Sequence, residues 1–315
     1  MYLFECLVLI LISSLITCTG RVTIRDRKVA EGLTKLRKLP QLDVCGLSNS
    51  GFGTKIIDGR PAELGAYPWM AVVGYRRPFG MKTMWGCGGS LVTNQHVITA
   101  AHCIDPSLLQ GYQLYEIRLG ELNLNESVID GTSPIDVGIE RTIKHEHYNT
   151  VTKLNDIAII KLKEKVQFTD LIKPICLPPT EFNTNTFLNH ASVVAGWGRS
   201  LNNTAYMSET CLLEAELTIQ DLDECRTNLT TKLRNVVIDD TVLCAYSPLS
   251  DTCQGDSGGP LMYPMKLQNS RANSEANLFL MGIVSYGYLC ARPGFPAVYT
   301  RVSRHMEWII DHLDI

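Results

Sequence analysis

Short apolar runs separated by turn residues dominate the chain beyond residue 55 and limit what it can fold into. The runs are rich in β-branched residues, and none carries a long helical period. Examples are Trp69–Gly74, Ser90–Ala100, Ile157–Leu162, Val193–Gly196 and Leu278–Ser285. This pattern predicts an all-β barrel or sandwich. The last stretch differs, because its apolar residues recur at three- and four-residue steps between Val302 and Leu313, which predicts a C-terminal helix packed on the β structure.

The first twenty residues are expected to be absent from the mature protein. Leu7–Ile16 is an apolar run of signal-peptide length, too short to cross a bilayer as a helix. Small residues near Cys18–Gly20 suit cleavage, so we interpret residues 1–20 as a signal peptide and expect a secreted, extracellular protein. An uncleaved membrane anchor is the alternative, because the preceding segment has Glu5 and no basic residue. No other stretch resembles a membrane span, so no stable membrane association is expected.

The cysteines and sequons agree with secretion. The chain has eleven cysteines, and loss of Cys6 and Cys18 with the signal peptide leaves nine. Their spacing contains no paired CxxC zinc signature, which favours disulfide bonds formed in an oxidising compartment. Candidate glycosylation sites, each an Asn-x-Ser/Thr sequon, are Asn125, Asn202 and Asn228.

Residues 21–55 differ in composition from the rest of the chain. Between residues 21 and 44 there are seven Lys or Arg against three Asp or Glu, and apolar residues are too sparse for a core. We interpret residues 21–55 as an exposed pro-segment whose basic run is a solvated tail. The formal net charge of the whole chain is −3, which argues against nucleic acid as a partner.

Three short motifs together supply the parts of a nucleophilic hydrolase. The run 251–260, Asp-Thr-Cys-Gln-Gly-Asp-Ser-Gly-Gly-Pro, contains a candidate nucleophile in Ser257. Taken alone it could be a surface turn, since Gly, Asp and Ser are common turn formers. His102 in Thr-Ala-Ala-His-Cys and Asp156 in Asn-Asp-Ile-Ala-Ile-Ile add a base and an acid. A serine hydroxyl is a weak nucleophile at neutral pH and needs a base such as imidazole to take its proton.

From Ile56 to Ile315 the chain resembles the trypsin-like (chymotrypsin-fold) serine proteases through these motifs. The resemblance implies two six-stranded antiparallel β-barrels with a C-terminal helix, and residues 56–315 as the protease domain. It also implies a catalytic triad of His102, Asp156 and Ser257, with an oxyanion hole from the backbone N–H groups of Gly255 and Ser257. The nearby His145 and His147 are expected at the surface. The chain order His, Asp, Ser excludes the α/β-hydrolase arrangement of lipases.

The same resemblance assigns the substrate pocket. Asp251 corresponds to the carboxylate at the pocket base and implies cleavage after Lys or Arg, while Ser285–Gly287 would pair with the substrate backbone. Gly287 corresponds to the glycine that keeps the pocket mouth open. One residue departs from the pattern, because Ala297 replaces the usual glycine of the pocket wall. Its methyl group is expected to narrow the pocket and to slow turnover or to alter the ratio of Lys to Arg cleavage.

Activation and disulfide pairing follow from the resemblance as well. Cleavage between Lys55 and Ile56 would free an ammonium group to pair with Asp256, which would order the oxyanion hole. Cys211 is left over as a free thiol or as a bond to another chain, because Ser192 and Tyr263 occupy the positions of a further family bridge. The implied disulfides are Cys87–Cys103, Cys225–Cys244, Cys253–Cys290 and a tether between Cys45 and Cys176.

The expected partners are a protein substrate, an activating protease and a serpin-type inhibitor. No cofactor is expected; a calcium ion at Glu121–Asp130 is a further possibility that the resemblance suggests. The rival interpretation is an inactive homologue that serves as a binding or regulatory module. The short pro-segment resembles that of arthropod clotting, immune and venom proteases. The sequence does not specify the physiological substrate, the preference for Lys over Arg, or the oligomeric state.

Overall fold

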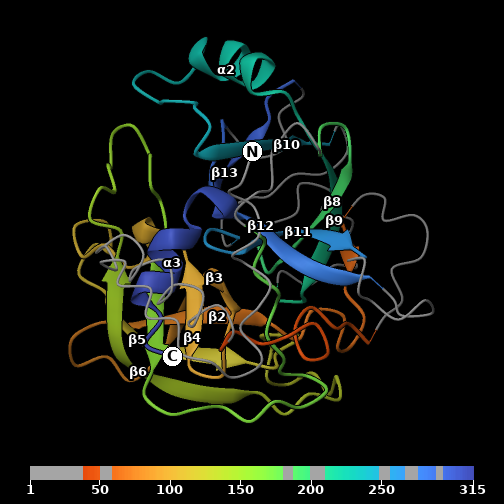
Figure 1. Ribbon diagram of the computed structural model, residues 1–315. Helices are drawn as coiled ribbons and strands as arrows, with labels where there is room; N and C mark the ends of the chain where they lie inside the picture. The colour runs from red at the N-terminus through yellow and green to blue at the C-terminus, as the bar shows by residue number, and fades with distance from the viewer. Residues whose placement is uncertain are drawn as a thin grey trace, which may run out of the picture.

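The fold consists of two closed antiparallel β-barrels (Figure 1). The structure is a computed structural model that describes residues 38–49, 59–179, 187–198, 210–247, 256–266, 276–288 and 294–315. The first barrel closes in the order β2-β3-β4-β7-β6-β5. Its strands are β2 (Met70–Arg76), β3 (Met84–Leu91), β4 (His96–Thr99), β5 (Gln113–Leu119), β6 (Ile135–Lys144) and β7 (Ala158–Leu162).

The second barrel has the order β9-β10-β13-β12-β11-β8, and a β8–β9 pairing closes it. A short strand, β1 (Arg60–Pro61), pairs antiparallel with β9. The barrel strands are β8 (Ala191–Gly196), β9 (Leu213–Ile219), β10 (Val242–Tyr246), β11 (Pro260–Met265), β12 (Asn277–Tyr286) and β13 (Ala297–Arg301). The expected all-β fold with two six-stranded barrels is confirmed.

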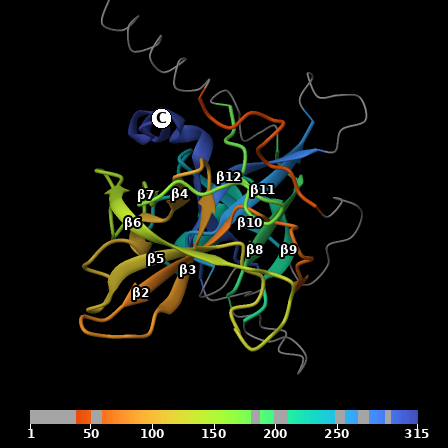
Figure 2. The same ribbon diagram turned by 90° about the horizontal axis from the view of Figure 1, so that it is seen from below.

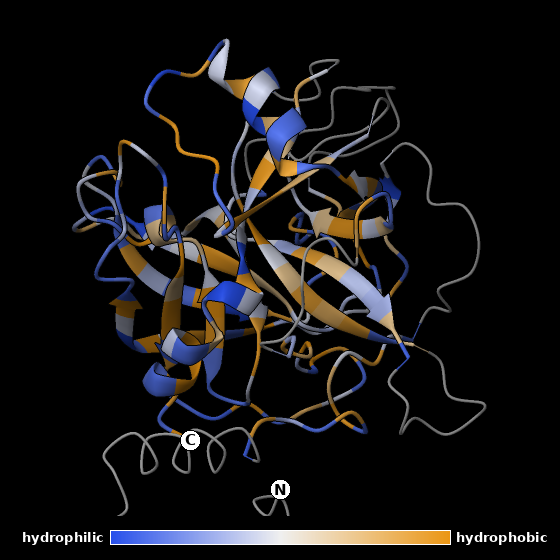
Figure 3. Cartoon of the chain, turned by 45° about the horizontal axis from the view of Figure 1, so that its top comes forward, coloured by the Kyte–Doolittle hydropathy of each residue, from blue (hydrophilic) through white to orange (hydrophobic). Residues whose placement is uncertain are grey.

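Burial explains why the short apolar runs become strands. Six of the seven residues of β2 and nine of the ten residues of β12 are buried. The last residue of each strand is partly exposed. Apolar residues concentrate in the strands, whereas most connecting loops are hydrophilic (Figure 3). Closure of a barrel removes unpaired sheet edges, so the backbone N–H and C=O groups of these strands bond to neighbouring strands. Their apolar side chains fill the interior of the barrel.

Two helices accompany the barrels in the described residues. The C-terminal helix α3 (Met306–His312) confirms the expectation, and Met306, Ile309 and Ile310 form its buried face. The helix α2 (Leu222–Thr230) was not predicted, because it buries only Cys225 and Leu229. Its start has a local signal, since the Asp221 side chain accepts hydrogen bonds from two first-turn N–H groups. Neither helix has the length or apolarity to cross a membrane.

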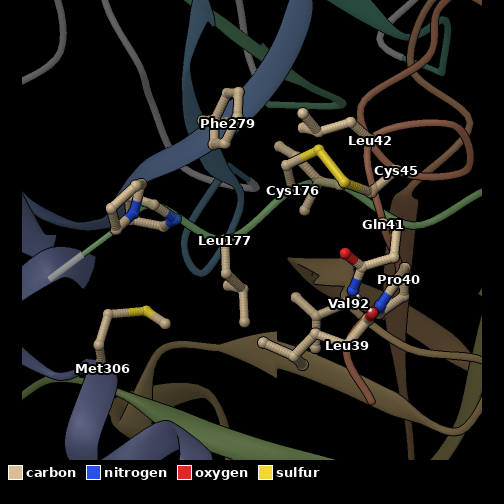
Figure 4. A pocket seen from close by; sticks show the side chains of 13 residues that line it. Leu39, Pro40, Gln41, Leu42, Cys45, Val92, Cys176, Leu177, Phe279 and Met306 are labelled. Carbon is tan, nitrogen blue, oxygen red and sulfur yellow. Dashed lines mark hydrogen bonds between the residues drawn. A yellow bond between two sulfur atoms is a disulfide. The ribbon is translucent and has the colours of Figure 1, made fainter. Parts of the chain in front are cut away.

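Residues 38–49, the described part of the predicted pro-segment, are attached to the rest of the chain. Cys45 is bonded to Cys176, and the Asn277 side chain donates to the carbonyls of Leu42 and Cys45, each at 2.8 Å. The Gly46 N–H donates to the Pro174 carbonyl, and the Gly46 carbonyl accepts from the Leu278 N–H. Figure 4 shows the apolar cavity of about 320 Å³ that lies between this segment and the domain. The tether therefore includes backbone pairing as well as a disulfide.

Candidate active site

His102 and Asp156 meet in a two-point contact. His102 lies in the 3-10 turn Ala101–Cys103 directly after β4, and Asp156 lies two residues before β7. Strands β4 and β7 pair with Thr99 opposite Ala158, which brings the two segments together. The His102 Nδ1 lies 2.7 Å from Asp156 Oδ2, and the His102 backbone N–H donates to Oδ1 at 2.9 Å. The two carboxylate oxygens therefore bind the same residue, one at its ring and the other at its backbone.

The Asp156 carboxylate is almost completely buried, with 1% of the residue exposed. The Ser285 hydroxyl in β12 donates to Oδ2 at 2.5 Å, and the Thr300 hydroxyl in β13 donates to the Asp156 carbonyl at 2.8 Å. Burial by itself raises the pKa of Asp156, but the adjacent His102 and the hydrogen bonds from His102 and Ser285 outweigh burial and lower it. Asp156 is therefore held as an anion by residues of both barrels.

The backbone of Ser257 is held against the first barrel. Its carbonyl accepts a hydrogen bond from the Gly88 N–H at 2.8 Å and lies 3.6 Å from Cys103 Sγ, next in the chain to His102. Gly258 has φ +80°, and a Cβ there would lie 2.2 Å from Thr99 Oγ1. Only glycine fits this position, because a side chain would be both strained and in steric conflict. Ser257 thus lies beside the turn that carries His102.

The Asp256 carboxylate occupies a space that two glycines leave open. The Gly198 N–H donates to Asp256 Oδ1 at 2.8 Å. A Cβ at Gly196 would lie 1.9 Å from Oδ1, and a Cβ at Gly198 would lie 2.4 Å from Oδ2. Sequence reasoning did not identify these two glycines. The sequence marks them only as a Gly-Trp-Gly run, residues 196–198, which begins at the last residue of β8.

Ala297 faces Gly287 in the second barrel. A Cβ at Gly287 would lie 3.8 Å from Ala297 Cα, and Ala297 is buried at the start of β13. The two residues expected to shape the pocket mouth and wall are therefore neighbours. Several predicted site residues lie outside the described residues: Asp251, Gly255, Lys55, Ile56, Cys253, Cys290 and Asn202.

Three of the expected disulfides are present in the described residues, namely Cys45–Cys176, Cys87–Cys103 and Cys225–Cys244. Within the described residues the Cys211 thiol forms no disulfide and is partly exposed. Burial raises its pKa, with a smaller contribution from Asp130. Ser192 is buried and donates to the Leu217 carbonyl at 3.0 Å, so its side chain serves the strand pairing of the barrel.

The candidate metal ligands have other partners. Among the described residues, Cys87, His102 and Cys103 form the one close group of ligand types, and its two sulfur atoms are bonded to each other. Glu121 Oε1 accepts from the N–H groups of Leu122 and Asn123, and Oε2 lies 3.3 Å from Arg118. The calcium site stays a prediction.

The two described sequons lie near the surface, with Asn125 exposed in a loop and Asn228 partly exposed in α2. His145 differs from its expected surface position. It is buried, its ring lies 4.9 Å from that of Trp308 in α3, and its centroid is 5.5 Å from that of His305. The expectation was wrong because Trp308 covers the segment, whereas His147 is exposed as expected.

The chain is similar in sequence to known proteins over most of its length. Residues 56–309 match the family model described as Trypsin. The chain is 40% identical over 86% of its length to the proclotting enzyme of Tachypleus tridentatus, of which the match covers 69%. It is also 40% identical to the venom serine protease Bi-VSP of Bombus ignitus, covering 84% of this chain and 69% of the relative. The venom protease of Bombus pensylvanicus is 40% identical, with 81% of this chain and 98% of the relative covered.

Proposed function

The chain belongs to the trypsin family of serine proteases, and on that premise we propose that it is a secreted zymogen that hydrolyses protein substrates after Lys or Arg. The observation that carries the proposal is the hydrogen-bonded set of His102, Asp156 and Ser285 beside the backbone of Ser257. It provides an oriented base beside the backbone segment that carries the Ser257 hydroxyl.

The proposed reaction has two halves. The Ser257 Oγ attacks the carbonyl carbon of the cleaved bond while its proton moves to His102 Nε2, and Asp156 stabilises the imidazolium. The N–H groups of Gly255 and Ser257 bind the developing oxyanion. The intermediate then expels the amine, which takes the proton from His102, and leaves an acyl group on Ser257. Water attacks this ester with His102 again as base, which releases the acid and restores the serine.

Selectivity is assigned to the pocket of the second barrel. Asp251 would attract the cation of Lys or Arg. A carboxylate without a partner in a pocket is costly in free energy, and the opposite charge of the substrate offsets that cost. Ser285 and Gly287 would pair with the substrate backbone, and Ala297 would narrow the wall opposite Gly287.

Activation is assigned to the bond between Lys55 and Ile56. The new Ile56 ammonium would pair with Asp256, whose carboxylate already lies against Gly196 and Gly198. The Cys45–Cys176 bond and the backbone pairing of Gly46 would keep the cut pro-segment attached. An activating protease that cuts after Lys is the implied partner.

The setting is a proteolytic cascade outside the cell. Relatives named as a proclotting enzyme and as venom proteases support an extracellular role on protein substrates. A serpin-type inhibitor is the corresponding regulator, because it would present a basic residue to the same pocket. The alternative of an inactive regulatory module is disfavoured by the intact contact between His102 and Asp156.

The decisive experiment compares the uncut chain, the chain cut after Lys55, and a cut Ser257→Ala variant on one Arg ester and one Lys ester. We expect turnover from the cut wild type, with a loss of about 10⁴-fold or more in the variant. Equal activity before and after cleavage would contradict the zymogen. Absence of turnover in all three forms would support the inactive module.

A further inference from the structure

Glu214 is a buried carboxylate whose partners come from the segment that follows the proposed cleavage site. It lies in β9, with 4% of the residue exposed. The Arg60 Nε donates to Glu214 Oε1 at 2.6 Å, and the Tyr67 hydroxyl donates to Oε2. Burial, together with the neighbouring Glu214 carboxylate, raises the pKa of Tyr67 far above its ordinary value. The phenol therefore stays protonated and remains a hydrogen-bond donor.

The burial of Glu214 is coupled to the docking of residues 60–67. A buried carboxylate is unfavourable unless an opposite charge and hydrogen bonds compensate for its lost hydration. Arg60 supplies the charge and Tyr67 supplies a hydrogen bond, and both residues follow shortly after the Lys55–Ile56 bond. Glu214 therefore connects β9 to the part of the chain that would carry the new amino terminus.

Glu214 extends the fixed part of this segment toward the cleavage point. The strand β1 has two residues, both exposed, and its register places Arg60 opposite Glu214. From Ala62 onward the chain is held differently, because Ala62 is buried and its N–H donates to the Leu212 carbonyl at 2.9 Å. The bond between Glu214 and Arg60 thus fixes the chain two residues closer to Ile56 than burial alone would fix it.

The fixed Arg60 lies on the same sheet as the groups that surround Asp256. Glu214 is paired with Arg60 on one side and with Ala195 of β8 on the other, so β9 lies between β1 and β8. Strands β8 and β9 are seen side by side in the second barrel in Figure 2. The residue after Ala195 is Gly196, which leaves space for the Asp256 carboxylate. Since neighbouring strands lie about 4.8 Å apart, two strand spacings place Arg60 about 10 Å from this end of β8.

The length of chain between Ile56 and Arg60 matches this separation. Ile56 lies four residues before Arg60, and four extended residues span at most about 14 Å. Counted from Ala62 the free segment has six residues, which span at most about 21 Å. The effective concentration of a tethered group is highest when the tether just reaches its site, and it falls as the tether lengthens. Fixing Arg60 therefore favours pairing of the new ammonium with Asp256.

We propose that Glu214 is a positioning residue for activation, which holds Arg60 and so sets the tether on which the Ile56 amino terminus reaches Asp256. This inference rests on the proposed zymogen function and adds to the ion pair the group that makes its formation efficient. Tyr67 acts through Glu214, because its hydroxyl binds the second carboxylate oxygen. Loss of either contact lengthens the free segment and lowers the fraction of cut chains in which the ammonium is paired.

The direct measurement is the rate at which cyanate carbamylates the Ile56 amine of the chain cut after Lys55, followed by mass spectrometry. A paired and buried ammonium is protected, so this rate reports the unpaired fraction. We expect Glu214→Gln and Arg60→Gln each to increase the rate about fivefold, and the double variant to be no worse than the single variants, because both remove the same contact. Arg60→Lys, which keeps the positive charge, should retain most of the protection.

A second readout is the loss of kcat/KM for an Arg anilide at alkaline pH. Pairing with Asp256 requires the charged form of the Ile56 amine, so activity is lost as the amine gives up its proton. Proton binding and pairing are linked, and a fivefold weaker pairing moves the midpoint of this loss down by about 0.7 pH unit. A purely structural role of Glu214 would change the activity without moving the midpoint.

Glu116→Gln is the matched control. Glu116 also accepts from an arginine and a hydroxyl, Arg76 at 3.3 Å and Thr83 at 2.5 Å, but these residues belong to the first barrel. The substitution should leave the carbamylation rate and the alkaline midpoint unchanged. Urea unfolding of every variant measures any general loss of stability. If Glu214→Gln does not fold, Tyr67→Phe replaces it, because Tyr67→Phe keeps the ion pair and is expected to increase the rate by about two- to threefold.

Three results would decide against the inference. An unchanged carbamylation rate and midpoint in folded Glu214→Gln or Tyr67→Phe would overturn the positioning role, and so would equal changes in Glu116→Gln. If cyanate labelled Ile56 of the cut wild type as fast as it labels the free peptide Ile-Ile-Asp-Gly, the activation mechanism itself would be rejected. Protection in the wild type that the Glu214 and Tyr67 variants lose would support the positioning role.

Discussion

The Ser285 hydroxyl and the Nδ1 of His102 both contact Asp156 Oδ2, at 2.5 Å and 2.7 Å. One oxygen of a buried carboxylate is thereby shared between a strand of the second barrel and the turn that carries the base. Ser285 therefore links the second barrel to the carboxylate that orients the imidazole of the first barrel.

We expect Ser285→Ala to lower kcat/KM by about ten- to a hundredfold, because a hydrogen bond to a charged group is worth about 1.5–3 kcal/mol. The measurement is the hydrolysis of an Arg ester by the cut chain. Ser192→Ala is the matched control, since Ser192 is also buried and donates to a backbone carbonyl of its own barrel. Equal losses in the two variants would indicate a general effect on the barrel.

Gly198→Ala is expected to reduce kcat/KM by about a hundredfold or more, because the new Cβ would lie 2.4 Å from the Asp256 carboxylate and displace it. Gly138→Ala provides the control, since its Cβ would meet the Lys163 side chain at an ordinary 3.7 Å. Urea unfolding of both variants separates a displaced Asp256 from a destabilised fold. An active Gly198→Ala enzyme would show that Asp256 does not organise the site.

Ala297→Gly is expected to change the ratio of kcat/KM for Lys and Arg substrates by several-fold, since one methyl group in a pocket is worth about 1–3 kcal/mol. The comparison uses matched Lys and Arg peptide substrates. Ala245→Gly in β10, whose Cα pairs with that of Ala297, controls for the loss of a buried methyl group. If both rates were unchanged in Ala297→Gly, the proposed narrowing of the pocket would be wrong.

The stability of the protein is expected to fall as the pH is lowered from about 6.5 toward 4 through His145. Burial lowers the pKa of this imidazole to about 4 from an ordinary value of 6.5. In this window the unfolded chain binds a proton that the folded chain excludes, so acid favours unfolding. Between pH 7 and pH 5 the contribution is about 2 kcal/mol.

Urea unfolding at pH 7 and pH 5 measures this difference. His145→Gln should reduce the loss on acidification, and His147→Gln, which changes the exposed neighbour, should leave it intact. The same pH dependence in His145→Gln and in the wild type would assign the effect to other groups.

Much of the candidate site was accessible from local sequence because its chemistry is carried by short motifs. His102, Asp156 and Ser257 each lie next to a strand, so the neighbours that mark each of them are close in the chain. Asp256 was identified in the same way, but Gly196 and Gly198 were not, since they act through space on a distant residue; Gly198 lies 58 positions from Asp256. His145 was placed wrongly for a similar reason, because its cover is Trp308 in the C-terminal helix.

The sequence by itself determined the fold class and, through the family pattern, the pairing of the described cysteines. It also predicts the chemistry of the three motifs, because that chemistry depends on residue type at short range. The tertiary structure decided which groups surround those residues. The contact of Ser285 with Asp156 spans 129 positions. Likewise, the space for the Asp256 carboxylate depends on Gly196 and Gly198 at the end of β8. Hydrogen bonds and steric contacts depend on distances of a few ångströms, and only the closed barrels set those distances between distant parts of the chain.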